Sequence, residues 1–460
     1  MSSFYVENFG CRATQADGAV IERELQQCGM TPAGAPGRAQ VVVLNTCTVT
    51  AAADRDVRAA IRRIHRQNPR CRILVTGCYA QRAPHEIAAI PGVSAVIGNS
   101  HKAQVAQLAS GRDPGGSLPK EAGARFATGL VQPTAADASP PLPGIYVGDI
   151  FAHTELAAAP VFEAGARTRP NLKVQDGCNH RCSFCVIPAV RGRSRSLPLA
   201  ETLREVQALA EAGYREVVIS GIDLGRWGRD LPGQNRFEDL LLAILEQTSL
   251  EKLRISSVEP MDWSDRLIAL VATSNRIAQH AHVPLQSGSD RVLRQMHRKY
   301  RPWHYAERIR KIREAMPEAA IGADVMVGFP GETDLDFAET QALVEQLPFT
   351  YLHVFTYSAR PGTPAAQMSG QVAAPLMRER NRILREIAAR KKLAFMQSFL
   401  GRTIDALTLH TYEGGHTEAL SDNYLKLRLP GRLEANRWVA AQVESADAAG
   451  LTGTLPTPES

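Results

Sequence analysis

Three closely spaced cysteines carry the strongest chemical signal in this sequence. Cys178, Cys182 and Cys185 follow a predicted strand within residues 176–185, so a single loop carries all three thiols. Thiolates are ligands of both iron–sulfur clusters and structural zinc. The residue type alone therefore leaves both metals open.

The number of ligands separates these two metals. Structural zinc is held by four protein ligands, so zinc at this loop would have to recruit a fourth one, for example His180. Three thiolates on a [4Fe-4S] cluster instead leave one iron open to an external molecule. The spacing and the number of ligands together favour the cluster.

A second set of cysteines is spread over the first part of the chain. Cys11, Cys47 and Cys78 each lie just beyond the carboxyl end of a predicted strand. In a parallel sheet these ends lie on one edge, where ligand crevices form, so three distant thiols can converge. The alternative is three cysteines buried by chance, which does not explain their recurrence at equivalent positions. We expect a second three-thiolate cluster.

The two remaining cysteines have different surroundings. Cys28 lies at a predicted helix end, and Cys71 precedes its strand. Both are therefore expected away from the edge that carries the second set, as ordinary buried or surface thiols. The sequence assigns no role to either of them.

The elements that position these cysteines predict an α/β chain, and its 460 residues are enough for two or three domains. Residues 1–108 predict an N-terminal parallel-sheet βα domain, in which short apolar runs alternate with helical stretches. These runs are residues 4–9, 41–45, 73–76 and 94–97. Residues 109–163, rich in alanine, proline and glycine, predict a linker with one strand near 145–150.

Residues 164–397 predict a central domain in which strands and helices alternate again. Six strand–helix units are too few for a full eight-unit barrel, so we expect an open, partial (β/α)6 barrel. Its predicted strands are residues 172–175, 216–220, 253–256, 281–284, 323–327 and 352–356.

Residues 398–460 predict a small β-barrel that follows a basic helix at 375–397. Its apolar runs are short and alternating and are separated by glycine turns. They are residues 403–408, 424–429, 437–443 and 451–455.

The cysteine loop resembles the signature of the radical SAM superfamily, including the aromatic Phe184 before the last cysteine. The resemblance implies that the open iron binds the amino and carboxylate groups of S-adenosylmethionine (SAM). It also implies reductive cleavage of SAM to methionine and a 5′-deoxyadenosyl radical.

Polar and glycine residues beyond the central strands are predicted to complete a SAM cradle together with the cysteine loop. They lie at the carboxyl ends of parallel strands, where ligands bind. The alternative for each single residue is an ordinary turn that ends a strand. The predicted contacts are Gly221, Glu259, Gln286, Ser287 and Gly328.

The chain from about residue 4 to 455 resembles the methylthiotransferase family. Residues 45–50 and 75–81 carry this resemblance together with the cysteine loop, and the terminal β region is similar to the RNA-binding TRAM domain. The family implies two [4Fe-4S] clusters and SAM as cofactors. The cluster on Cys178, Cys182 and Cys185 would make the radical, and the cluster on Cys11, Cys47 and Cys78 would carry the sulfur.

Members of this family modify either an aspartate of a ribosomal protein or an adenosine beside the tRNA anticodon, which carries an isopentenyl or a threonylcarbamoyl group. Residues 190–196, 254–259 and 351–357 look most like the threonylcarbamoyladenosine branch. The resemblance therefore implies that a methylthio group is placed on C2 of N6-threonylcarbamoyladenosine in the anticodon stem-loop.

Basic residues offer contacts to such a substrate. A net charge of +6 suits a polyanionic partner but is also common on ordinary surfaces. Arg191, Arg193 and Arg195 could bind phosphates or the threonyl carboxylate, although a solvated arginine-rich loop is an equal alternative. In the terminal barrel we expect RNA contacts from Lys426, Arg428 and Arg432.

The expected surroundings of the protein follow from the same features. No apolar run is long enough to span a membrane, and residues 2–8 lack the blocks of a signal peptide, so we expect a cytoplasmic monomer. The resemblance implies a reducing partner such as flavodoxin or ferredoxin. A different class stays open, a non-catalytic RNA-binding protein with structural metal sites in which every thiol set is closed.

Overall fold

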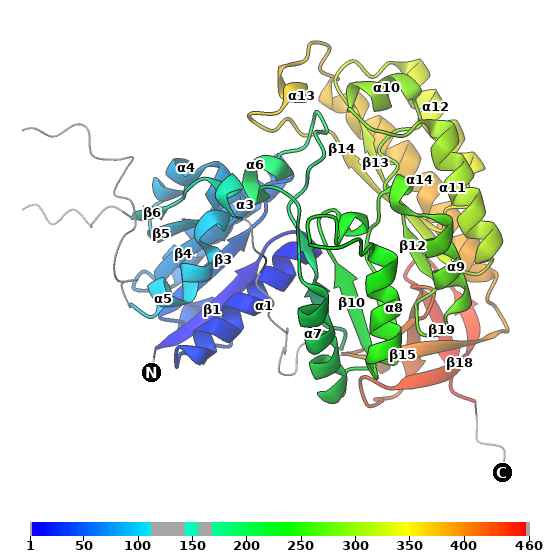
Figure 1. Cartoon of the computed structure of the whole chain (residues 1–460), viewed down its shortest axis with the longest axis horizontal. Coiled ribbons are helices and arrows are strands. Elements are labelled where there is room, and N and C mark those ends of the chain that lie inside the picture. The colour runs from blue at the N-terminus through cyan, green and yellow to red at the C-terminus, as the bar shows by residue number, and fades with distance from the viewer. Residues whose placement is uncertain (1, 112–142, 154–155, 157–167, 457–460) are drawn as a thin grey trace, which may run out of the picture. The chain divides into compact units, whose positions relative to one another are not determined.

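The computed structural model describes residues 2–111, 143–153, 156 and 168–456, which belong to two compact units (Figure 1). The first unit comprises Met1–Thr48 and Ala52–Ile150, and the second comprises Val49–Ala51 and Phe151–Ser460. Most of the predicted linker lies outside the described residues. Among the residues that are described, no helix is long and apolar enough to cross a membrane.

The first unit is built on a six-stranded parallel sheet with the order β2-β1-β3-β4-β5-β6. All four predicted strands are present, and the strand expected near 145–150 is β6, which pairs with β5. Only the two-residue β2 had no signal in the sequence. The strands are β1 (Ser3–Asn8), β2 (Thr31–Pro32), β3 (Val41–Thr46), β4 (Arg72–Gly77), β5 (Val93–Gly98) and β6 (Gly144–Tyr146).

Helices cover both faces of this sheet, which explains why its central strands are apolar at successive positions. Every residue of β3 is buried. Its Val42 packs with Ile61 of α2, whereas its Val43 packs with Ile21 of α1. The helices are α1 (Arg12–Gln27), α2 (Ala51–Gln67), α3 (Cys78–Arg82), α4 (Pro84–Ala88) and α5 (Val105–Ala109).

The second unit contains the predicted partial barrel. Six parallel strands follow one another in chain order as two three-stranded sheets, and a bridge between Leu253 and Ile277 links them. The strands are β7 (Asn171–Lys173), β10 (Glu216–Ser220), β11 (Lys252–Ile255), β12 (His280–His282), β13 (Ala320–Val327) and β14 (Tyr351–Thr356). A short hairpin of β8 (Gln175–Asp176) and β9 (Arg195–Ser196) brackets the cysteine loop.

Helices connect these strands and pack against them in one large apolar core. They are α6 (Ile187–Arg191), α7 (Leu199–Glu211), α8 (Phe237–Gln247), α9 (Asp265–Thr273), α10 (Asp290–Gln295), α11 (Pro302–Ala315), α12 (Asp334–Gln346), α13 (Pro364–Gln367) and α14 (Ala374–Gln397). The basic helix expected at 375–397 is α14, and it leads directly into the terminal strands.

The terminal strands close into a five-stranded barrel with the order β15-β16-β17-β19-β18. Four of the five were predicted, and β16 was missed. The strands are β15 (Thr403–Glu413), β16 (His416–Ser421), β17 (Lys426–Pro430), β18 (Trp438–Ala446) and β19 (Leu451–Thr454). Closure pairs the strand edges that an open sheet would expose.

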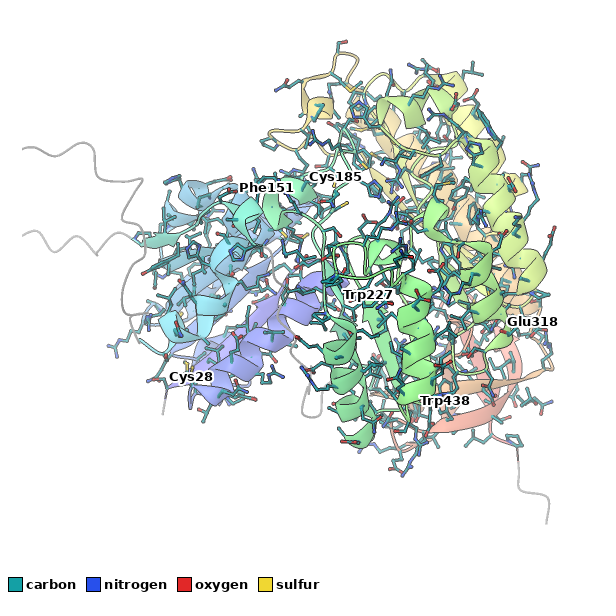
Figure 2. All side chains as sticks on the ribbon, in the orientation of Figure 1. Cys28, Phe151, Cys185, Trp227, Glu318 and Trp438 are labelled. Carbon is teal, nitrogen blue, oxygen red and sulfur yellow. The ribbon has the colours of Figure 1, made fainter. Side chains whose placement is uncertain are left out.

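This small barrel is attached to the amino-terminal ends of the parallel strands by a buried arginine. The side chain of Arg254 is fully buried and forms an ion pair with the equally buried Glu216. Its guanidinium also donates to the carbonyl oxygens of Ser421 and Asp422 at 3.2 and 2.9 Å. Figure 2 labels Glu318 and Trp438 in this region, and Cys185 lies at the other end of the strands. Breaking a buried pair of this kind costs about 3–5 kcal/mol.

Candidate iron–sulfur sites

Backbone contacts hold the loop that carries Cys178, Cys182 and Cys185. The amide of Cys178 donates to the carbonyl oxygen of Gly192 at 3.1 Å, and that of Cys185 donates to Cys182 at 3.1 Å. Gly177, which precedes the first cysteine, has a φ of +69°, and a Cβ there would lie 2.0 Å from the carbonyl oxygen of Arg193. The turn into the loop therefore requires glycine.

The sulfur atoms of this loop receive hydrogen bonds, as thiolate ligands of a cluster need. The His180 amide donates to Cys178 Sγ at 3.3 Å, and Arg298 Nη1 donates to Cys182 Sγ at 3.4 Å. Burial raises the pKa of Cys185 to about 12, and burial together with Asp223 also raises the pKa of Cys178. A bound metal must therefore displace protons from these thiols.

The distances between donor atoms distinguish an iron–sulfur cluster from zinc. Sulfur ligands of one tetrahedral zinc ion lie about 3.8 Å apart, given Zn–S bonds of about 2.3 Å. Among the described residues, which include all eight cysteines, no three donor atoms of cysteine, histidine or acidic residues lie within 4.8 Å of one another in a set that contains a cysteine. His180 faces Asp223 instead, with Nε2 3.3 Å from Oδ2. These donor atoms are therefore not arranged around a single zinc ion.

Two of the predicted SAM contacts border cavities next to the cysteines. Glu259 lines one cavity together with Cys182 and Arg298. Gln286 borders another together with Cys185, and its buried Oε1 has no hydrogen-bond partner among the described residues. An orphaned buried acceptor of this kind fits a site that receives a polar ligand.

The other three predicted SAM contacts follow β10, β12 and β13 as expected, but their surroundings differ. Gly221 lies beside Gln175, where an added Cβ would be 2.9 Å from Oε1. The hydroxyl group of Ser287 lies 3.2 Å from that of Thr340 and accepts a hydrogen bond from the backbone. A Cβ on Gly328 would lie 2.2 Å from Met377 Cγ, so this glycine packs against α14.

Arg298 is a functional candidate that sequence reasoning missed. Its side chain is almost fully buried, forms an ion pair with Glu259 and donates to Cys182. It lies more than a hundred residues from the cysteine loop in a basic stretch that reads as solvated surface. No pattern in the sequence marks it, because its burial depends on the packing of that stretch against the loop.

The expectation that Arg191 and Arg195 are available to bind a substrate is wrong. Arg191 is 1% exposed and donates to both carboxylate oxygens of Asp176, at 2.9 and 3.1 Å. Arg195 is also buried, and it donates to backbone carbonyl oxygens of the same loop. Both arginines stabilise the hairpin that holds the cysteines, and of the three only Arg193 is exposed.

Strand register brings the second set of cysteines to one edge of the first unit. Thr46 and Gly77 are partners in the pairing of β3 with β4, so Cys47 and Cys78 come next on neighbouring strands. Neighbouring strands lie about 4.8 Å apart. Cys11 reaches the same edge through Gly10, where an added Cβ would lie 2.3 Å from Cys47 Cβ and 2.8 Å from its Sγ.

The edge also supplies polar support to these thiols. Asn99 Nδ2, at the end of β5, donates to Cys78 Sγ at 3.6 Å, and Cys11 Sγ lies 3.5 Å from Thr14 Oγ1. Asn45 Nδ2 donates to the carbonyl oxygen of Thr14 at 2.6 Å, which joins β3 to the first turn of α1. Cys11 is exposed, whereas Cys47 and Cys78 are buried, so the set is accessible from one side.

The two remaining cysteines lie away from this edge. Cys28 caps the far end of α1, where Figure 2 labels it, and Cys71 is buried before the start of β4. Burial raises the pKa of Cys71, as expected for an inert core thiol.

The partial barrel and its three-thiol loop define a radical SAM enzyme. The model of the Radical SAM superfamily matches residues 172–344, and that of Uncharacterized protein family UPF0004 matches residues 3–98. The radical SAM methyltransferase TsrM from Kitasatospora setae shares the fold, with a TM-score of 0.56 and 16% identity over 80% of this chain and 77% of that chain.

Curated relatives specify the family further. Threonylcarbamoyladenosine tRNA methylthiotransferase MtaB of Aquifex aeolicus is 34% identical over 94% of this chain and 98% of its own length. The protein of the same name from Bacillus subtilis is 35% identical over 94% and 91%. The tRNA-2-methylthio-N(6)-dimethylallyladenosine synthase of Saccharopolyspora erythraea is 34% identical over 88% and 78%. The chain belongs to the methylthiotransferase family of radical SAM enzymes.

Proposed function

We propose that this enzyme transfers a methylthio group to C2 of N6-threonylcarbamoyladenosine next to the tRNA anticodon, giving 2-methylthio-N6-threonylcarbamoyladenosine. The observation that carries the proposal is the similarity over nearly the full length to several methylthiotransferases named for this nucleoside, at 31–35% identity for four of them.

In this proposal the two thiol sets hold two [4Fe-4S] clusters with different tasks. Cys178, Cys182 and Cys185 hold the cluster that binds SAM, whereas Cys11, Cys47 and Cys78 hold the cluster that carries sulfur. When bound, these groups would supply the electron that cleaves SAM and the sulfur that is inserted. A radical made from a cofactor is needed because the unactivated C–H bond of the substrate cannot be attacked by acid or base catalysis.

The residues of the chain bind, orient and protect these groups. Arg298 donates to Cys182 and holds Glu259 at the edge of the adjoining cavity, where Glu259 would contact SAM. Gln286 would contact SAM through its unpartnered Oε1. The roles of Gly221, Ser287 and Gly328 are to shape the strand ends around the cofactor.

The proposal also assigns a role to each domain. Residues 1–108 form the methylthiotransferase domain with the sulfur-carrying cluster, 109–163 the linker region and 164–397 the radical SAM domain. Residues 398–460 form a TRAM-like RNA-binding domain whose exposed Lys426 and Arg432 would contact phosphates of the anticodon stem-loop. Arg428 contributes less, because it is paired with Asp447 at 2.7 Å.

The cellular setting follows from this chemistry. The enzyme acts as a monomer in the cytoplasm, where its tRNA substrate is found. A small reducing protein such as flavodoxin or ferredoxin delivers the electron.

Nucleoside mass spectrometry of tRNA from a strain that lacks this gene tests the substrate. We expect the methylthio form of threonylcarbamoyladenosine to disappear while its unmodified precursor accumulates. Complementation with the wild-type gene should restore the product, and complementation with Cys47→Ala should not.

A second candidate substrate rests on a specific observation. A synthase named for dimethylallyladenosine is 34% identical to this chain, as close as the Aquifex relative. Loss of the methylthio form of that nucleoside from the deletion strain, with the threonylcarbamoyl product untouched, would move the enzyme to this substrate.

A further inference from the structure

Three metal-binding side chains meet on neighbouring strands of the partial barrel. His282 lies on β12, Asp324 on β13 and His353 on β14, and Asp324 and His353 are register partners. The residues that flank Asp324 on β13, Ala323 and Val325, pack into the apolar core beneath the helices. Because side chains alternate along a strand, Asp324 and its two histidine neighbours project from the opposite face.

The donor atoms have the spacing of a metal site. His282 Nε2 lies 3.2 Å from Asp324 Oδ2, and His353 Nδ1 lies 3.2 Å from Asp324 Oδ1. One donor atom from each residue can be chosen so that all three lie within 4.8 Å of one another. Ligand atoms around a tetrahedral ion with bonds of about 2.0–2.1 Å lie roughly 3.3 Å apart.

The inner ring nitrogen of His282 is buried beside the carboxylate of Asp324. His282 is 6% exposed, and its Nε2 has no hydrogen-bond partner of adequate geometry among the described residues, although Asp324 is close.

A tyrosine holds the other ring nitrogen of His282. Tyr351 Oη lies 2.9 Å from His282 Nδ1 and 2.7 Å from His280 Nε2. If Nδ1 donates to the tyrosine and the tyrosine donates to His280, Nε2 of His282 keeps its lone pair for a metal. Histidine ligands of metal ions are oriented by such partners of their second nitrogen.

A glycine in the middle strand makes this contact possible. Tyr351 lies on β14 and reaches across β13 to β12 over Gly322, where an added Cβ would lie 2.0 Å from the tyrosine ring. Any side chain at position 322 would push the ring away from both histidines.

We propose that His282, Asp324 and His353 form a binding site for a divalent first-row transition metal ion, separate from the two iron–sulfur sites. Two imidazoles and one carboxylate leave coordination positions open and suit Zn²⁺ or Fe²⁺. The side chain of His353 is 63% exposed, which gives the ion a route of entry. The backbone carbonyl oxygen of Asp324 accepts from the amide of Gln286 at 2.8 Å, so the ion would stabilise the strand end that carries a proposed SAM contact.

Zinc binding to the full-length enzyme, with both clusters reconstituted under anaerobic conditions, tests this site. Bound zinc is measured by mass spectrometry after a weak chelator has removed loosely held ions, and X-ray absorption at the zinc edge reports the ligands. We expect one zinc ion with nitrogen and oxygen ligands at about 2.0–2.2 Å and no sulfur ligand at about 2.3 Å. A parallel sample, given ferrous iron before zinc, shows by Mössbauer spectroscopy whether a high-spin ferrous ion takes the same site.

Matched variants decide whether this zinc belongs to the proposed residues. His353→Gln should lose the zinc without unfolding, because the side chain is exposed, whereas His304→Gln, at an exposed histidine of α11, should retain it. Tyr351→Phe should weaken zinc binding by about 10–100-fold through the loss of orientation of His282. Equal zinc binding by wild type and His353→Gln, or zinc held by sulfur, would overturn the proposal.

Discussion

The two thiol sets each contain three cysteines, but different structural elements hold them in place. Cys178, Cys182 and Cys185 lie on one loop, and a hairpin with a buried Asp176–Arg191 pair holds that loop. The other set lies just beyond the ends of three strands that are brought together by a parallel sheet. The first set is a local feature that needs a stable hairpin, whereas the second depends on strand register across the whole first unit.

This difference affects how each set tolerates change. Damage to the hairpin disturbs one loop, while a shift of any of the strands β1, β3 or β4 would separate a thiol from the other two. Both sets share one device, a glycine with positive φ directly before a cysteine, Gly177 in the loop and Gly10 at the sheet edge. The two sets can therefore be broken one at a time.

The largest expected effect comes from removing a single thiol in each set. Cys182→Ala should abolish formation of 5′-deoxyadenosine, because the cluster that binds SAM loses a ligand. Cys47→Ala should leave reductive cleavage of SAM largely intact and stop formation of the methylthio product. Iron, sulfide and 5′-deoxyadenosine measurements on reconstituted protein check this pair. If iron content is unchanged in Cys11→Ala, Cys47→Ala and Cys78→Ala alike, the assignment of a second cluster to these cysteines is wrong.

Substitution of either glycine should disturb only the neighbouring set of cysteines, because it changes the local backbone geometry and removes no thiol. Gly10→Ala places a Cβ 2.3 Å from Cys47 Cβ, and Gly177→Ala places one 2.0 Å from a backbone oxygen, so each should lose the iron of its own cluster. The strained φ adds about 1–3 kcal/mol of destabilisation in each case.

Gly29→Ala is the matched control for these two variants, because Gly29 also has a positive φ but an added Cβ would have nothing within 4 Å. It should lower the melting temperature without loss of iron. Iron analysis and thermal unfolding compare the three variants. Identical iron contents in all three would remove the distinction between the two sets.

A smaller effect is expected from Arg298, which touches only the loop set. Arg298→Gln removes a positive charge and a hydrogen bond from Cys182 Sγ, both of which stabilise the more negative, reduced cluster. The reduction potential of the cluster on the cysteine loop should become more negative by tens of millivolts in Arg298→Gln. The shift should be smaller in Arg298→Lys, which keeps the positive charge. Redox titration followed by electron paramagnetic resonance measures this for each cluster separately. A shift in the second cluster, or none in the first, would contradict this role of Arg298.

The smallest effect is expected from the two cysteines outside both sets. Cys28→Ala and Cys71→Ala should retain all cluster iron. Because Cys71 is buried, Cys71→Ala should lower the free energy of unfolding by about 1 kcal/mol. Iron analysis and denaturant unfolding provide the check. Iron loss in either variant would place that cysteine in a cluster and break the division into two sets of three.

Much of the fold could be predicted because it depends on local patterns. Alternation of apolar runs with helical stretches identified all six strands of the partial barrel and four of the sheet strands. The short β2 was missed because two exposed residues carry no periodic signal. β16 was missed because its two apolar residues, Ala419 and Leu420, are adjacent and give no alternating pattern.

The sequence by itself determined the types and spacing of the six cysteines and the strand ends on which they lie. The tertiary structure decided what surrounds them. Arg191, which reads as a free basic residue, is buried against Asp176, and Arg298 donates to a cysteine more than a hundred residues away. The histidine and aspartate cluster also comes from three separate strands. Such pairings carry no signal in the sequence, because they depend on strand register and packing between distant segments and not on local periodicity.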